Sequence, residues 1–90
     1  MTITKAKARV MVLEGQKYEE LGAVHGALAE HLAGAVTEIE HIFENAPVHA
    51  RKAIRIALNK ARREQEAHEG RAAEMTEAAI MIDEELTTTS

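Results

Sequence analysis

Cysteine and tryptophan are absent from this sequence, and phenylalanine and tyrosine occur once each. Without cysteine the chain can form no disulfide, no thiolate zinc site and no cysteine nucleophile. A single proline and five glycines leave little turn chemistry for β-hairpins or a β-sandwich. The hydrophobic residues, 46% of the chain, are mostly Ala, Leu, Ile, Val and Met, a composition typical of packed helices. An all-α protein is predicted.

Features that membrane insertion, secretion or catalysis would need are missing as well. No apolar run approaches the roughly 20 residues that span a bilayer, and charged residues interrupt the N-terminal stretch where a signal peptide needs its hydrophobic segment. We therefore expect a cytoplasmic protein that does not contact a membrane. The sequence also has no glycine-rich phosphate loop and no serine within its helical body. No enzymatic activity, no catalytic residue and no cofactor are predicted.

The clearest break in the chain is the segment FENAPVH, residues 43–49. Asn45 is a tolerable helix end, and Pro47 cannot continue the preceding helix but can begin the next. Because the connection is short, the helices on its two sides must fold back as an antiparallel hairpin. Within a single domain of residues 1–90 we predict an N-terminal arm or short helix at 1–15, helices at 16–45 and 48–86, and a frayed tail at 87–90.

Apolar or small residues recur on both sides of this break at alternating steps of three and four. This is the heptad pattern of long helices that pack against one another. The predicted stripe of the first helix consists of Tyr18, Leu21, His25, Leu28, Leu32, Ala35, Ile39, Ile42 and Ala46. The predicted stripe of the second helix consists of Ile54, Leu58, Ala61, Gln65, His68, Ala72, Met75, Ala79, Ile82 and Leu86.

The segment at residues 4–14 is ambiguous between a short helix and a strand. Its Ala and Lys content favours a helix capped at Thr4 and ended at Gly15, whereas β-branched residues at both of its ends permit a strand. We favour the helix. Further along, Gly22 and Gly26 are spaced by four residues, which indicates a close approach of a second helix.

Apolar residues beside the two stripes exceed what one hairpin can cover. The usual solution is a pair of hairpins, so we expect a homo-oligomer, preferably a homodimer that forms a four-helix bundle. A monomeric three-helix arrangement that uses residues 4–14 is the alternative. We predict a small helical interaction or assembly module that self-associates through coiled-coil-like packing and binds a protein partner. The candidate interface residues are Val36, Phe43, Ile56, Ile80 and Met81.

A basic run, RKAIRIALNKARR at residues 51–63, stands out in a chain of net charge -4. Folding about Pro47 brings this run alongside residues 30–42, which hold three glutamates. We expect Arg55 and Arg62 to project from a different flank of the helix and not to meet those glutamates. The run is then mainly a solvated face with partial salt bridging within or between hairpins.

Nucleic-acid binding is the alternative interpretation of the same run. Its side chains could contact phosphates without reading sequence. A dimerising hairpin of heptad-patterned helices also resembles the architecture of Rop-type RNA-binding regulators, and this resemblance implies a regulator that binds nucleic acid. Overall acidity and the scarcity of aromatic residues for base stacking argue against it. The candidate phosphate contacts are Arg55, Lys60, Arg62 and Arg63.

His25 and His68 both fall on the predicted stripes, at positions that a hairpin would bring to the same level. Three interpretations are open. The pair forms a polar layer that fixes the helix register, or a pH-sensitive element in which two protonated rings repel. In the third, the pair belongs to a small metal-binding bundle in which Glu64, one turn before His68, is a carboxylate ligand.

Overall fold

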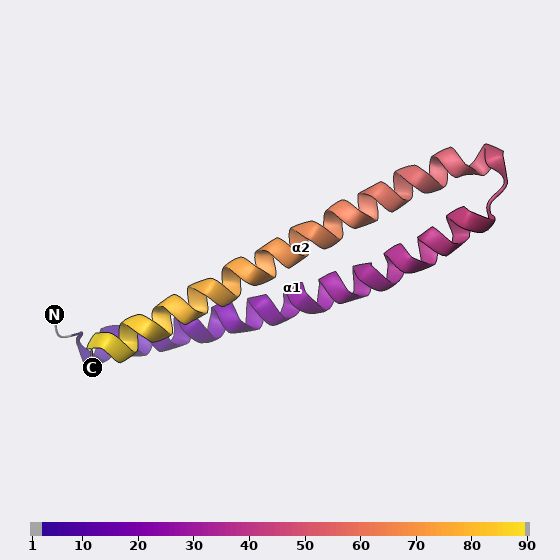
Figure 1. Ribbon diagram of the computed structural model, residues 1–90. Coiled ribbons are helices and arrows are strands. Elements are labelled where there is room, and N and C mark those ends of the chain that lie inside the picture. The colour runs from indigo at the N-terminus through magenta and orange to yellow at the C-terminus, as the bar shows by residue number, and fades with distance from the viewer. Residues whose placement is uncertain (1–2, 90) are drawn as a thin grey trace. The chain divides into compact units, whose positions relative to one another are not determined.

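The computed structural model describes residues 3–89, which form two long helices, α1 (Lys5–Asn45) and α2 (Val48–Thr89). The helices run antiparallel and are joined through Ala46 and Pro47 (Figure 1). No strand occurs among residues 3–89. The predicted all-α helical hairpin is confirmed.

The start of α1 agrees with the sequence, but its course through Gly15 does not. The backbone N–H of Lys7 donates a hydrogen bond of 3.2 Å to the Thr4 hydroxyl. The first N–H groups of a helix have no carbonyl partner within the helix, and this hydroxyl supplies one. The helical interpretation of residues 4–14 is thus confirmed from Lys5 onward, whereas the predicted end at Gly15 is wrong. Glycine inside a helix costs only about 1 kcal/mol relative to alanine. Ile82 of α2 lies beside this glycine, since a Cβ atom on Gly15 would meet its Cγ2 atom at an ordinary contact distance of 3.6 Å.

The turn between the helices lies where the sequence placed it. The Asn45 side-chain amide donates to the His41 carbonyl over 2.9 Å at the end of α1. The Arg51 Nε–H donates to the Ala46 carbonyl over 3.2 Å, so the first turn of α2 holds the connection. The predicted helix boundaries at Asn45 and Val48 are confirmed.

The C-terminal end of α2 extends three residues beyond the predicted end at Leu86, to Thr89. Two threonine hydroxyls donate to carbonyls one turn earlier. Thr87 bonds the Asp83 carbonyl over 2.8 Å, and Thr88 bonds the Glu84 carbonyl. The predicted frayed tail is therefore helical as far as Thr89. Ser90 of that tail and residues 1 and 2 of the predicted N-terminal arm lie outside the described residues.

The hairpin divides into two compact units, each containing a segment of both helices. Unit 1 comprises Met1–His25 and Arg71–Ser90, and unit 2 comprises Gly26–Gly70. In unit 1, Met11 and Ala79 are buried and lie around one hollow of about 230 Å³ together with Gly15 and Ile82. The buried residues of unit 2 are Ala29, Val36 and Leu58.

The close approach of a second helix that the glycine spacing predicted is present at Gly22, in unit 1. A Cβ atom there would lie 3.3 Å from Thr76 Oγ1, 3.5 Å from Met75 Cβ and 3.6 Å from the Ala72 carbonyl oxygen. Glycine therefore lets α2 come close at this level. At Gly26 nothing lies within 4 Å of an added Cβ atom, so the same explanation is wrong there.

The buried side of α1 in unit 2 is rotated from the predicted stripe. Ala29 and Val36 are buried, whereas their larger neighbours Leu28 and Ile42 are 41% and 55% exposed. The prediction that Leu28 and Ile42 belong to the inner stripe of the first helix was therefore wrong. Ala29 and Val36 take the innermost positions, where smaller side chains let the helices approach closely. Leu32 and Ile39 of the predicted stripe are half-buried beside them.

The buried side of α2 follows the predicted stripe at every position. Each residue of that stripe, from Ile54 to Leu86, is buried or half-buried, with Leu58 and Ala79 the most covered. The polar members Gln65 and His68 are half-buried as well. The heptad pattern of the second helix therefore predicted its inner face correctly.

Candidate interaction surfaces

The most unusual feature of this hairpin is how little of it is fully buried. Among the described residues no side chain has less than 2% of its surface exposed, and no polar or charged residue is buried. Ten large hydrophobic side chains of the described chain are exposed instead. Most large apolar side chains of the described residues are therefore exposed or half-buried.

The predicted interface residues fall into three groups. Ile56, Ile80 and Met81 are exposed, by 61%, 52% and 61%, all on α2. Phe43 is half-buried. Val36 is only 7% exposed, so it belongs to the core of unit 2, and its assignment to an outer surface was wrong. The one-residue rotation of α1 explains this error, because it turns Val36 inward.

Phe43 is covered by two arginines of the basic run. The guanidinium carbons of Arg51 and Arg55 lie 5.8 Å and 5.3 Å from the centre of its ring. These are cation–π distances, and each such contact on an exposed site contributes about 0.5–1 kcal/mol. Two of the six basic side chains of residues 51–63 are therefore engaged by the only phenylalanine in the chain.

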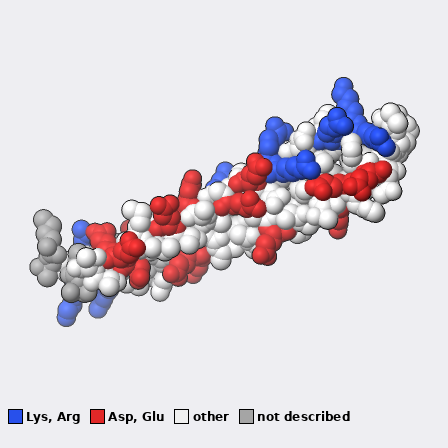
Figure 2. All heavy atoms as spheres, viewed as in Figure 1, with Lys and Arg blue, Asp and Glu red and all other residues white. Residues whose placement is uncertain are grey.

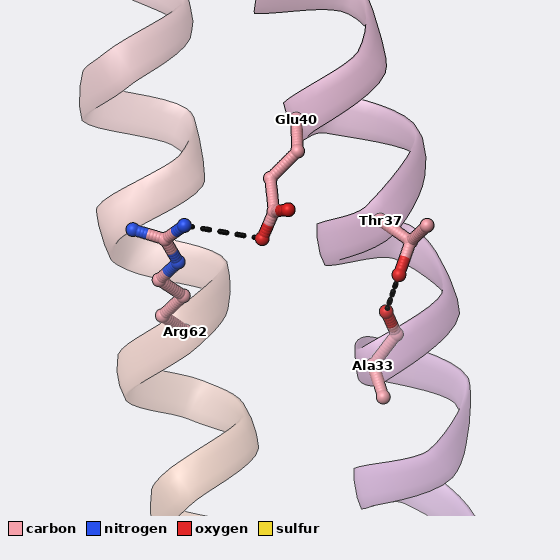
Figure 3. Close-up of polar contacts among 4 residues, drawn as sticks. All are labelled: Ala33, Thr37, Glu40 and Arg62. Atoms are coloured by element: carbon pink, nitrogen blue, oxygen red, sulfur yellow. Dashed lines mark hydrogen bonds and ion pairs between the residues drawn. The ribbon is translucent and has the colours of Figure 1, made fainter.

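Arg62 forms an ion pair across unit 2, contrary to the expectation that it would miss the glutamates of α1. Its Nη2 atom lies 3.1 Å from Glu40 Oε1, and the two side chains are 49% and 45% exposed. Figure 3 shows the Arg62 side chain reaching from α2 toward Glu40, one turn from the Thr37–Ala33 hydrogen bond within α1. Because α1 is rotated from the predicted orientation, Glu40 lies beside the contact between the two helices of unit 2, within reach of Arg62.

Three further basic side chains, Lys52, Lys60 and Arg63, are exposed on α2 and form no ion pair with any described carboxylate. Lysine and arginine side chains gather over the turn-side part of α2, and acidic side chains lie beside them (Figure 2). The salt bridging expected for this run is therefore partial, with Arg62 paired and these three side chains open to solvent.

An open hollow of about 420 Å³ lies beside this basic run in unit 2. Two glutamates and two arginines contribute to its wall, together with Phe43, Leu58 and Asn59. Every polar side chain around it is exposed or half-buried, and it contains no hydroxyl or thiol nucleophile.

The histidines predicted as a pair belong to different units, His25 to unit 1 and His68 to unit 2. Both are half-buried, and Glu64 is exposed. No group of three or more His, Asp or Glu side chains within residues 3–89 is placed to hold a metal ion. The register, pH and metal interpretations of the two histidines stay predictions.

Each unit also exposes apolar side chains on a second face of α1, which the sequence interpretation did not separate from the predicted stripe. These are the exposed side chains Val10, Leu13, Val24, Leu28 and Ile42, which we call the outer stripe. Val10, Leu13 and Val24 belong to unit 1 and follow one another at 3 and 11 residues, and Leu28 and Ile42 belong to unit 2 and lie 14 residues apart. These intervals are sums of steps of three and four, so within each unit the members share one face of the helix. At about 100° per residue this face lies roughly 120° around α1 from the buried positions. The apolar residues of this face are visible in the sequence, but they adjoin the apolar residues of the inner face of α1. The heptad pattern therefore counted both sets as one stripe.

The described part of the chain contains no helix apolar over the length that a bilayer crossing requires. No protein-family model, no curated protein and no solved structure matches this chain.

Proposed function

We propose that this chain is a small helical assembly module without enzymatic activity, which self-associates through coiled-coil-like packing and binds a protein partner. One observation carries the proposal. Ten large hydrophobic side chains are exposed, and within residues 3–89 no side chain is fully buried. A hairpin alone leaves a small core, and oligomerisation is a common way to enlarge it.

The energetic argument follows from how helices are stabilised. Most of the stability of a helix in a protein comes from packing its apolar face, and not from intrinsic propensity. α2 buries one face, whereas α1 presents an inner face and the outer stripe. Covering the outer stripe would give α1 a second packed face, as in the helices of a four-helix bundle.

The test is the mass of the protein in solution, by light scattering across a size-exclusion peak at low and at high salt. The proposal predicts a mass of two chains or more at both salt concentrations, because apolar burial is not screened by salt. A mass of one chain over the whole accessible range of protein concentration would overturn self-association.

The proposed contacts for a protein partner are Ile56 in unit 2 and, separately, Ile80 and Met81 in unit 1, because these side chains of α2 are exposed and lie outside the outer stripe. The variants Ile56→Glu and Met81→Glu should keep the mass of the wild type and weaken partner binding. Lys52→Glu is the matched control, since it changes an exposed position of the same helix without removing apolar surface. If Ile56→Glu lowers the mass, this surface serves self-association.

A second candidate function, a Rop-like regulator that binds nucleic acid, is favoured by Lys52, Lys60 and Arg63, which lack an ion pair with any described carboxylate. It predicts nucleic acid that co-purifies at low salt and is lost at high salt. Bound nucleic acid would dominate the ultraviolet absorbance, since the chain has one Tyr and no Trp. Lys60→Glu/Arg63→Glu should abolish this binding and leave the helical content unchanged. Absence of nucleic acid at low salt would remove this candidate.

A further inference from the structure

The turn-side part of α2, over which lysine and arginine side chains gather (Figure 2), also carries two exposed apolar side chains of unit 2. Val48 and Ile56 are 81% and 61% exposed, and Lys52 lies between them at a step of four residues from each. Side chains at this spacing are neighbours on the surface of a helix. The row continues through Lys60, and Arg63 lies on the same side, seven residues after Ile56. We call these five exposed side chains, all in unit 2, the basic face.

The lysines and the arginine of the basic face are not neutralised along their own helix. Lys52, Lys60 and Arg63 form no ion pair with any described carboxylate. Along α2 no carboxylate lies within four residues of Lys52. Glu64 and Glu66 follow Lys60 and Arg63 by one turn, so they reduce the positive charge at the end of the face that is farther from the turn. The positive charge is therefore least compensated around Lys52.

The carboxylates of α1 in unit 2 do not neutralise the basic face either. Glu40 is paired with Arg62 over 3.1 Å, and Glu40 and Glu44 both line the open hollow of unit 2. No member of the basic face lines that hollow. The other two carboxylates of α1 in unit 2, Glu30 and Glu38, form no ion pair with any described lysine or arginine. The basic face therefore keeps positive charge that a partner can match.

A partner of complementary chemistry has to offer carboxylates and apolar side chains together. Carboxylates form charge-assisted hydrogen bonds with ammonium and guanidinium groups, and covering Val48 and Ile56 removes apolar surface from water. These two side chains are eight residues apart, about 12 Å along the helix. Because the basic face is a row at steps of four residues, it fits the groove between two rows of side chains on a second helix. The matching element is an amphipathic helix whose apolar residues repeat at that interval, with glutamate or aspartate beside them.

Nucleic acid matches this surface less well than an acidic helix does. Phosphates contact basic side chains and leave Val48 and Ile56 uncovered. Unit 2 carries seven glutamates against six lysine and arginine side chains, so it has no net positive charge to attract a polyanion over long range. Phe43 is the only Phe, Tyr or Trp of unit 2, and Arg51 and Arg55 cover its ring, so no such ring is open for base stacking. The local pattern of charge and apolar surface therefore favours a protein partner.

We propose that the basic face binds an acidic amphipathic helix of a partner protein. One apolar side chain of that helix packs on Ile56 and a second on Val48, and its carboxylates pair with Lys52, Lys60 and Arg63. This proposal rests on the proposed function, since it states the chemistry of the partner protein whose contact in unit 2 is Ile56. One helix face is smaller than a standard interface, so the complex is transient and its affinity depends on salt.

The test uses the full chain and a synthetic helical peptide labelled with fluorescein. The peptide, of about 16 residues, has two leucines at the interval of Val48 and Ile56, glutamates one turn from each leucine and alanine elsewhere. A control peptide has the same composition, with its two leucines on opposite sides of the helix. Fluorescence anisotropy should show saturable binding of the patterned peptide at low salt and weaker binding of the control peptide. Both should bind less tightly at high salt.

Single substitutions identify the surface that binds the patterned peptide. Ile56→Ala should raise the dissociation constant about fivefold to tenfold, because apolar contact is lost. Lys52→Gln should raise it about twofold to fivefold at low salt, and this effect should fade at high salt. The matched controls are Ile80→Ala and Arg71→Gln, which remove the same apolar group and the same charge at exposed positions of α2 in unit 1. Both should leave the dissociation constant unchanged.

The outcomes separate this proposal from the proposed function. Absence of binding at low salt, equal affinity for the two peptides, or wild-type affinity of Ile56→Ala would overturn the proposal and leave self-association intact. Tighter binding of a single-stranded oligonucleotide of the same net charge, unaffected by Ile56→Ala, would overturn it in favour of nucleic acid. A lower mass of Ile56→Ala in light scattering would overturn it in favour of a second copy on this face. A wild-type mass of one chain, together with binding of the patterned peptide that Ile56→Ala weakens, would support the proposal and overturn self-association.

Discussion

Alanine at Gly34 should stabilise this protein. Gly34 is exposed within α1, and nothing lies within 4 Å of the position a Cβ atom would take. Alanine is about 0.8–1.0 kcal/mol more favourable than glycine inside a helix, and no neighbour has to move to accommodate the methyl group. For a chain of this length about 1 kcal/mol corresponds to a Tm increase of about 4–8 °C, and this is the expected result for Gly34→Ala.

The matched control is Gly22→Ala, since Gly22 also lies inside α1 but faces α2 at close range. A methyl group there would lie 3.3 Å from Thr76 Oγ1, so the hydroxyl must shift and part of the helical gain is lost. Thermal unfolding of both variants by far-ultraviolet circular dichroism should therefore show the larger increase for Gly34→Ala. A lower Tm for Gly34→Ala beside a higher one for Gly22→Ala would refute the reasoning, because it would mean that Gly34 is the residue in close contact.

Two further predictions concern unit 2. Leu58→Ala should lower the unfolding free energy by about 2–3 kcal/mol in a denaturant titration, since Leu58 is 7% exposed and its loss leaves a cavity; an unchanged midpoint would contradict its place in the core. A double-mutant cycle of Arg62→Gln and Glu40→Gln should give a coupling energy of about 0.2–1 kcal/mol that falls with salt, as for exposed ion pairs. A coupling well above that range and insensitive to salt would show that the pair is covered in the assembled protein.

The second helix was the part of the fold that the sequence predicted most fully. Most of its inward-facing apolar residues follow one heptad stripe, with Ile56, Ile80 and Met81 outside it, and charged residues occupy most of the other faces. Only one side can then face the partner helix. The turn was predictable for a similar reason, because proline restricts the backbone at one position and Asn45 ends the preceding helix.

The first helix was harder to interpret because apolar residues cover two of its faces. Ranking positions by size selects Leu28 and Ile42, whereas the hairpin buries the smaller Ala29 and Val36. The choice between these faces depends on how closely the two helices approach, which is a property of the packed pair and not of either helix alone. The Arg62–Glu40 contact was missed for the same reason, since it depends on that rotation. The continuation through Gly15 was missed because a glycine inside a helix costs only about 1 kcal/mol and does not by itself end the helix.

The claim that the hairpin completes its core with a second copy is tested most directly by the dependence of Tm on protein concentration. Over about a hundredfold range of concentration, mass action changes the stability of a dimer by about 2.7 kcal/mol. With an unfolding entropy of about 2.1 cal/mol/K per residue over two chains, the expected rise in Tm is about 7 °C. A Tm that is the same at both ends of that range, for a protein that elutes with the mass of one chain, would contradict the account.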